Sequence, residues 1–204
     1  MPVPQRIAIT GASGLIGTAL VGHLKSEGHT VQRLVRRAPV SADEVQWDPQ
    51  TGFVDLEPLR GVDAIIHLAG VGVGDKRWNK KYKSEILNSR LLGTTAIANA
   101  VAELKPQVFI SSSAIGWYGE SGNRAVVETD RAGDDFLAAV CREWEAAADL
   151  AGDIRTVKIR TGLVLDPTGG ALGKMLPLFR LGLGGKMGNG KQWWSWITLH
   201  DQIR

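Results

Sequence analysis

The sequence has little cysteine and no long apolar run. Its 204 residues include one cysteine, Cys141, which excludes an intramolecular disulfide framework. No run of about 18 apolar residues occurs, and the start of the chain lacks the long apolar region of a signal peptide. Four scattered histidines and one cysteine give no cluster with metal-ligand spacing. These absences predict a soluble, cytoplasmic protein with no membrane contact and no metal site.

An excess of charge of one sign is also missing. The formal net charge is +3, with 22% charged and 44% hydrophobic residues, as in an ordinary globular protein. The densest basic stretch covers residues 75–83 and contains Trp78 and Tyr82. Such a stretch could bind a nucleic-acid strand, but a solvated rim or a clamp for an anionic substrate is the stronger interpretation. We expect a small-molecule substrate and no nucleic-acid partner, and the oligomeric state stays open.

Glycine is abundant where the chain first turns. The apolar run from Ile7 to Thr10 leads directly into a Gly-x-x-Gly-x-x-Gly turn and then a helix, the order found in dinucleotide-binding sites. The first glycine allows a turn that is costly for residues with a Cβ, the second lets a pyrophosphate approach, and the third lets the helix pack on the strand. The positive end of the helix then faces the phosphates. The residues expected to bind the cofactor here are Gly11, Ser13, Gly14, Leu15, Ile16 and Gly17.

Apolar strands alternate with helical segments along most of the chain. The expected strands cover residues 6–10, 30–35, 64–69, 108–112 and 155–160. Crossovers long enough for helices join them, which predicts an α/β fold with a doubly wound parallel sheet of the Rossmann type. Residues 45–54 are the exception. They predict two short extended pieces around a turn, in place of a full crossover helix.

The regular alternation ends after Thr161, where glycine becomes dense and we expect mainly loops. The last residues, 196–204, are typical of a strand that enters a helix. We expect an NADP-binding Rossmann domain over residues 1–165 and the start of a substrate-side segment over residues 166–204. Because this segment ends on such a pattern, we also expect a truncated chain.

Several blocks in order along the chain match one family. They include residues 11–17, Ile66-His67-Leu68-Ala69-Gly70, residues 111–119, Trp144-Glu145-Ala146-Ala147 and residues 160–165. The chain resembles the atypical short-chain dehydrogenases/reductases of the epimerase family, in the short-chain family 39U group, which is similar to the nucleotide-sugar epimerases. Members of this group are longer. The resemblance implies that a C-terminal domain, with much of the substrate lid, follows the part seen here.

The end of the second expected strand predicts the cofactor. An acidic residue there would bind the adenosine ribose of NAD, but the chain has Val35, Arg36 and Arg37. A guanidinium at Arg36 can bind a 2′-phosphate with two hydrogen bonds and stack on adenine, so we expect NADP(H). The alternative is that these arginines are solvated loop charges.

The resemblance implies further cofactor contacts. Leu68, Ala69 and Gly70 stand at the end of an expected strand, at the carboxyl edge of the sheet, where doubly wound folds bind ligands. Glu85 and Arg90, on the next helix, are expected to reach the ribose and the pyrophosphate. Val164 is the last residue that we expect to contact the cofactor. We expect His67 to be a structural histidine with its hydrogen bonds satisfied rather than a proton carrier.

The catalytic residues depart from the family pattern. The resemblance gives Ser113 the role of binding the reacting substrate oxygen, but the usual partner, a Tyr-x-x-x-Lys pair, is missing. Leu137 and Cys141 stand at the matching positions. Tyr118 is the nearby phenol, and an activating group must come from elsewhere in the fold. Tyr118 could equally be an aromatic side chain that packs on the cofactor.

We therefore expect an NADP(H)-binding epimerase- or reductase-like protein that acts on an unidentified, nucleotide-sugar-like substrate. Hydride transfer would occur near Ser113 and Tyr118 and depend more on Ser113. The missing tyrosine and lysine favour an alternative, a non-catalytic NADPH-binding sensor or interaction protein.

Overall fold

The computed structural model describes residues 3–186 and 188–204. Its main sheet has seven strands in the order β4-β3-β2-β1-β5-β6-β7. The strands are β1 (Arg6–Thr10), β2 (Thr30–Val35), β3 (Glu44–Asp48), β4 (Phe53–Val54), β5 (Ala64–His67), β6 (Val108–Ala114) and β7 (Thr156–Thr161). All neighbouring strands are parallel except β3 and β4. This confirms the predicted doubly wound sheet, and the antiparallel β3–β4 pair confirms the predicted turn between short extended pieces.

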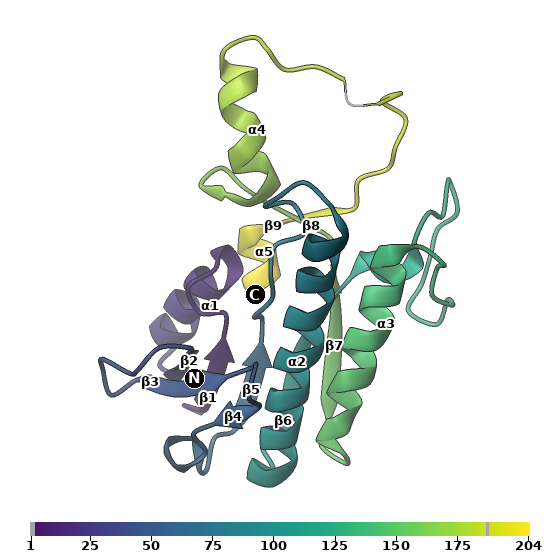
Figure 1. Ribbon diagram of the computed structural model, residues 1–204. Helices are drawn as coiled ribbons and strands as arrows, with labels where there is room; N and C mark the ends of the chain where they lie inside the picture. Colours follow the sequence, from purple (N-terminus) through teal and green to yellow (C-terminus); the bar gives the residue numbers. More distant parts are fainter. Residues whose placement is uncertain (1–2, 187) are drawn as a thin grey trace.

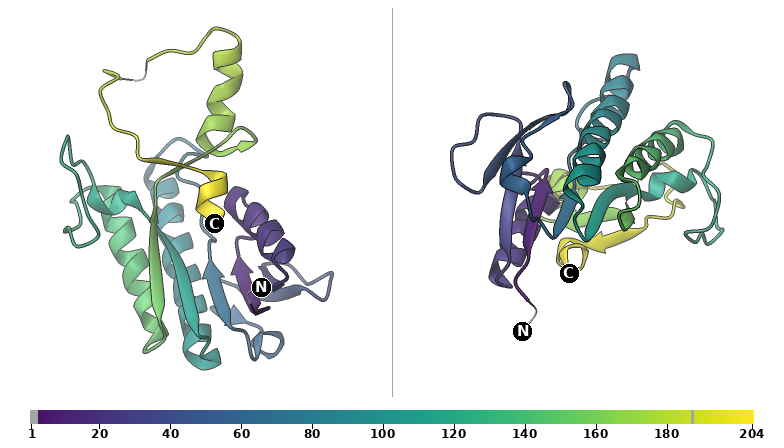
Figure 2. Two further views of the ribbon diagram at one scale, coloured as in Figure 1. Left: turned by 180° about the vertical axis from the view of Figure 1, so that it is seen from behind. Right: turned by 90° about the horizontal axis from the view of Figure 1, so that it is seen from below.

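Helices cover both faces of the sheet (Figure 1). Seen from below, α2 and α3 lie on one face, and α1 and α5 lie on the other (Figure 2). The α-helices are α1 (Leu15–Ser26), α2 (Lys80–Leu104), α3 (Phe136–Ala148), α4 (Gly170–Arg180) and α5 (Leu199–Ile203). Short 3-10 helices are η1 (Glu57–Leu59), η2 (Ile115–Tyr118) and η3 (Asp149–Ala151). Among the described residues, no helix combines the length and apolar character that a bilayer crossing requires.

Burial on both faces explains why the strands are almost continuously apolar. In β1, Ala8 belongs to the core beneath α2 and α3, whereas Ile7 and Ile9 belong to the core beneath α1. The register places Thr10 beside His67, and His67 beside Ser111. The carboxyl ends of β1, β5 and β6 therefore meet at one edge of the sheet.

Several predicted element boundaries were wrong. The strand expected to reach residue 69 ends at His67, because the Thr10 hydroxyl accepts the next two backbone N–H groups, those of Leu68 and Ala69. The strand expected to end at residue 112 continues to Ala114. β7 covers residues 156–161, one position later than the predicted 155–160.

The segment after Thr161 is more regular than predicted. It contains β8 (Leu163–Asp166) and β9 (Trp196–Thr198), which pair in parallel, and α4 between them. Leu172, Leu176 and Phe179 follow helical spacing, a signal that the dense glycines had obscured. α4 stands beyond the carboxyl edge of the main sheet (Figure 1). The expected strand and helix at the end of the chain are confirmed as β9 and α5.

Candidate functional site

A cleft of about 1110 Å³ opens at the carboxyl ends of β1, β2 and β5. The chain leaves β1 for β2 in one direction across the sheet and later places β5 on the other side of β1. Such a reversal of strand order creates a ligand crevice in doubly wound folds. Ten of the predicted cofactor residues line this cleft: Gly11, Ser13, Gly14, Val35, Arg36, Arg37, Leu68, Ala69, Gly70 and Glu85.

The glycine turn packs against the floor of the cleft. Gly11 has a φ of +69°, and a Cβ there would lie 2.8 Å from the backbone carbon of Leu68. A Cβ at Gly17 would lie 2.1 Å from the carbonyl oxygen of Gly11. Both positions therefore require glycine for the packing of the protein itself.

The fold alone does not require glycine at position 14. Its backbone is extended, with φ −79° and ψ 174°, and a Cβ there would meet nothing closer than the Gly11 carbonyl oxygen at 3.4 Å. Gly14 is the exposed N-cap of α1 and has no side chain with which to cap the helix. The first N–H groups of the helix, including those of Leu15 and Ile16, remain available to a ligand. This geometry fits a pyrophosphate held close to the backbone.

The described residues that line the cleft do not include Leu15, Ile16 and Gly17. We therefore expect these three residues to contact the cofactor through their backbone N–H groups. The Leu15 side chain instead lies beside the loop before α4, where a Cβ at Gly169 would be 3.1 Å from Leu15 Cδ1.

Three arginines near the end of β2 differ in their partners. Arg37 donates to both oxygens of Glu44, each at 2.7 Å. Arg33 donates to Asp43 at 3.0 and 3.1 Å and lies 3.2 Å from Glu44. Arg36 is exposed and forms no ion pair with any residue that the structure describes. A guanidinium without a carboxylate partner thus lies at the cleft beside two that are already paired.

The same contacts change the acidity of the carboxylates. Hydrogen bonds from Arg37, and next from the Val40 backbone, lower the pKa of Glu44 to about 2. The hydrogen bond from Arg33 holds the pKa of Asp43 well below its usual range. Glu44 lines the cleft, but its charge is balanced by Arg37, so it leaves the positive charge of Arg36 in excess.

A buried histidine fixes the floor of the cleft. Thr10 Oγ1 accepts hydrogen bonds from the N–H groups of Leu68 and Ala69, at 3.1 and 3.2 Å. Its own hydrogen is therefore left to donate to His67 Nδ1, which lies 2.7 Å away. His67 Nε2 then carries the ring proton, has no hydrogen-bond partner among the described residues, and lies beside Trp47 in an edge-on ring contact. Burial lowers the pKa of His67 to about 3, so it is neutral and structural.

Sequence reasoning missed most of the cleft wall that α2 supplies. Besides Glu85, this wall contains Lys81, Ser84, Asn88 and Ser89. These polar residues repeat at spacings of three and four along one helix face, a pattern that could have identified them. Trp47, Pro49 and Gln50 add a wall from the end of β3 and the turn after it.

Of the three cofactor contacts predicted on α2 and β8, only Glu85 lies at the cleft. Glu85 lines the cleft and is 3.5 Å from Lys76. Arg90 is turned inward: its Nη1 donates to the carbonyl oxygens of Val71 and Ile86, and its guanidinium lies over the Trp144 ring. Burial lowers the pKa of Arg90. Val164 lies in β8, beside Ile197 of β9. Neither Arg90 nor Val164 is among the described residues that line the cleft.

Ser113 and Tyr118 are joined by two residues that sequence reasoning did not select. Ser113 Oγ donates to Glu145 Oε1 at 2.5 Å. Arg160 donates from Nε and Nη2 to the two oxygens of Glu145, at 2.8 and 3.0 Å, and from Nη1 to Tyr118 Oη at 3.1 Å. The hydrogen bond to Glu145 raises the pKa of Arg160 further above its ordinary value. An acidic residue on the otherwise buried face of α3 was the signal that could have found this pair.

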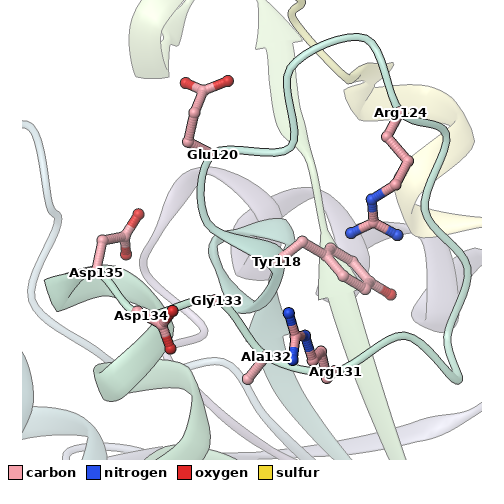
Figure 3. A pocket seen from close by; sticks show the side chains of 8 residues that line it. All are labelled: Tyr118, Glu120, Arg124, Arg131, Ala132, Gly133, Asp134 and Asp135. Atoms are coloured by element: carbon pink, nitrogen blue, oxygen red, sulfur yellow. The ribbon is translucent and has the colours of Figure 1, made fainter.

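A second cavity, of about 330 Å³, lies against Tyr118. Figure 3 shows the Tyr118 ring at its centre, with Glu120, Asp134 and Asp135 on one side and Arg124 on the other. The phenol oxygen points away from Asp134 and Asp135 (Figure 3).

Leu137 and Cys141, at the positions of the family's tyrosine and lysine, do not provide an ionisable group that could exchange a proton with a substrate near neutral pH. Leu137 is apolar, and the buried Cys141 Sγ lies 3.7 Å from the Ala114 carbonyl oxygen. Burial raises the pKa of this thiol. Across residues 3–186 and 188–204, no group of three or more His, Cys, Asp or Glu side chains is arranged to hold a metal ion.

Comparison with known proteins relates this geometry to a family. The model of the NAD dependent epimerase/dehydratase family matches residues 7–204. Epimerase family protein ML0860 of Mycobacterium leprae is 44% identical over 201 residues, which cover 97% of this chain and 65% of that protein. Epimerase family protein SDR39U1 of Homo sapiens is 38% identical over 203 residues, covering 97% of this chain and 67% of that protein. The chain thus spans 65 to 67% of the length of these relatives.

Solved structures have the same fold. The nucleoside-diphosphate sugar epimerase from Corynebacterium glutamicum matches with a TM-score of 0.86 and 40% identity, covering 98% of this chain and 42% of that chain. The crystal structure of human SDR39U1 (isoform 2) with NADPH matches with a TM-score of 0.86 and 36% identity, covering 97% of this chain and 67% of that chain. Since the family match extends over nearly all of its residues, this chain belongs to the NAD dependent epimerase/dehydratase family.

Proposed function

We propose that the cleft binds NADP(H), with the pyrophosphate on the glycine turn and the 2′-phosphate on Arg36. The observation that carries this proposal is the Arg36 guanidinium after β2, which pairs with no carboxylate among the described residues, whereas carboxylates hold the neighbouring Arg33 and Arg37. A free guanidinium can grip a phosphate with two parallel hydrogen bonds. The human relative, whose solved structure contains NADPH, supports the same choice.

We further propose that the protein is an epimerase or reductase that acts on a nucleotide-sugar-like substrate. NADP(H), when bound, supplies or accepts the hydride. Ser113 lies near the carboxyl end of β6 and Tyr118 follows this strand, which pairs with β5, so both lie next to the edge where the cleft opens. A protein 40% identical to this chain is described as a nucleoside-diphosphate sugar epimerase, which supports the substrate class.

A specific observation favours a second candidate function. Leu137 and Cys141 occupy the places of the tyrosine and lysine, and neither can exchange protons with a substrate as that pair does. A protein that only binds NADPH, as a sensor or an interaction partner, would need neither residue. NADPH consumption with a panel of carbonyl substrates, including nucleotide sugars, separates the two functions.

Calorimetry with NADPH and NADH tests the cofactor assignment. We expect NADPH to bind more tightly, and Arg36→Ala to remove most of the difference. A hydrogen bond to a charged group contributes about 1.5 to 3 kcal/mol, so the preference should be roughly 10- to 150-fold. Arg155→Ala is the matched control, because Arg155 is exposed and precedes β7 at the opposite edge of the sheet. Equal affinities for the two cofactors in the wild type would refute the assignment.

A further inference from the structure

A buried ion pair connects the two candidate catalytic residues. The side chains of Glu145 and Arg160 are 7% and 17% exposed, and they face each other with two hydrogen bonds. The Arg160 guanidinium also lies 3.9 Å from the centroid of the Trp117 ring and donates to the Glu128 carbonyl oxygen at 3.0 Å. A guanidinium held by stacking and several hydrogen bonds keeps one orientation.

This orientation determines which hydroxyl hydrogen a ligand can use. An ionised carboxylate only accepts hydrogen bonds, so the Ser113 hydrogen is committed to Glu145. A guanidinium only donates, so the Tyr118 oxygen accepts from Arg160 and keeps its own hydrogen free. Ser113 therefore presents lone pairs, and Tyr118 presents a donor.

The exposure of the two side chains also favours Tyr118 over Ser113 as the hydrogen-bond donor to a ligand. Ser113 is 4% exposed, whereas Tyr118 is only partly buried and its ring lines the 330 Å³ cavity. Figure 3 shows the Tyr118 ring among the residues that line this cavity. The Tyr118 hydroxyl donates to no acceptor among the described residues, so a ligand oxygen that binds its hydrogen displaces no protein hydrogen bond. The same approach to Ser113 would have to break its bond to Glu145 to obtain a donor.

We propose that Tyr118 is the catalytic proton donor of this site, and that Arg160 is the positioning residue that takes the place of the missing lysine. Glu145 is a second positioning residue, because it holds Arg160 and takes the hydrogen of Ser113. The proposal rests on the proposed hydride-transfer function. It reverses the order of importance expected from the sequence, in which Ser113 came before Tyr118.

Tyr118 supplies the proton that the reduction of a carbonyl substrate requires. NADPH, when bound, supplies a hydride to the carbonyl carbon of the substrate. The Tyr118 O–H bond breaks, and its proton forms the new O–H bond on the carbonyl oxygen. The negative charge left on the phenol oxygen faces the Arg160 guanidinium, and a proton from water restores the phenol.

Ultraviolet resonance Raman spectroscopy tests the arrangement without turnover, because the tyrosine Fermi doublet reports whether a phenol oxygen accepts a hydrogen bond. The chain has two tyrosines, so a Tyr82→Phe background isolates Tyr118. We expect the doublet of an accepting phenol, and we expect Arg160→Met to change it to that of a phenol bonded only to water. Arg124→Met is the matched control, because Arg124 lines the same cavity and pairs with Asp130. An unchanged doublet in Arg160→Met would overturn the role of Arg160.

Arg160→Met alone leaves the buried Glu145 carboxylate without its partner and could unfold the protein. The double variant Arg160→Met, Glu145→Met removes both charges and then serves for the same spectrum, since apolar replacement of a whole buried pair is usually tolerated.

Turnover tests the roles of the two hydroxyls, with 9,10-phenanthrenequinone as the carbonyl probe and NADPH absorbance as the readout. We expect Tyr118→Phe to reduce the rate by about 100-fold or more, and Ser113→Ala to reduce it less. A larger loss in Ser113→Ala than in Tyr118→Phe would overturn the proposal. A wild type that consumes no NADPH would count against the proposed function, and the Raman spectra would then decide the role of Arg160 by themselves.

Discussion

Gly14 and Gly17 lie three residues apart in one turn but are glycine for different reasons. A Cβ at Gly17 would collide with the Gly11 carbonyl oxygen, whereas a Cβ at Gly14 would make only an ordinary contact with that oxygen, at 3.4 Å. The structural need for Gly17 is visible within the protein, and the need for Gly14 becomes visible only when a ligand is brought to the turn. The three glycines of the motif are equivalent in the sequence, so only the contacts separate them.

Because of this difference, we expect substitutions of Gly14 and Gly17 to have different effects. Gly14→Val should fold, with a melting temperature close to that of the wild type, and should lose NADPH binding, because the branched side chain fills the space of the pyrophosphate. Gly17→Ala should lose about 1 to 3 kcal/mol of stability or more, because the turn must shift. Circular dichroism and calorimetry measure the two effects. Retained NADPH binding in Gly14→Val would mean that the glycine loop is only a tight turn.

Arg36 and Arg37 show where residue-level prediction from the sequence stops. Both are basic, adjacent and at the end of an expected strand, so the sequence predicts phosphate binding for either. The parallel pairing of β2 with β3 places Glu44 beside Arg33, where its carboxylate also reaches Arg37. Strand pairing thus decides which arginine has a carboxylate partner, and local sequence spacing does not reveal this pairing.

At the scale of elements, the strands of the main sheet and the order of helices follow from apolar runs and crossover lengths. The exact strand ends do not, because a side chain from another strand can end a ladder, as Thr10 does for β5. α4 was also missed, since local glycine content obscured its helical spacing. The Glu145–Arg160 pair required α3 and β7 to be brought together, which no local pattern specifies.

His67, a residue of β5, contacts Thr10 of β1 and Trp47 of β3, and its burial predicts a pH dependence of stability. Its pKa is about 3 in the folded protein and about 6.5 in an unfolded chain. Between these values the unfolded chain binds a proton that the folded protein does not. Above pH 6.5, His67 therefore leaves the free energy of unfolding unchanged. Below pH 6.5, the free energy of unfolding decreases by about 1.4 kcal/mol for each unit by which the pH is lowered.

Urea unfolding at pH 7 and pH 5 measures this effect. We expect the wild type to lose about 2 kcal/mol between the two, and His67→Gln to lose much less. The lowered pKa values of Asp43 and Glu44 act mainly below this window. His200→Gln, in the exposed α5 position, is the control and should keep the wild-type slope. An identical slope in His67→Gln would show that other groups cause the dependence.

At the scale of the whole molecule, the cleft and the Tyr118 cavity lie at the carboxyl ends of neighbouring strands. The cleft follows β1, β2 and β5. The network of Ser113, Glu145, Arg160 and Tyr118 lies at the carboxyl ends of β6 and β7, which contain Ser113 and Arg160. A cofactor in the first and a substrate carbonyl beside the second would meet at one edge of the sheet. This arrangement is the reason for preferring a hydride-transfer enzyme to a protein that only binds NADPH.

A crystal structure of the chain with NADPH would show whether the cleft is the cofactor site. We expect the pyrophosphate over Gly14 and the first turn of α1, and the 2′-phosphate within hydrogen-bond distance of the Arg36 guanidinium. We expect the nicotinamide toward the end of β6. A dinucleotide bound with its 2′-phosphate away from Arg36, or bound outside the cleft, would contradict this assignment.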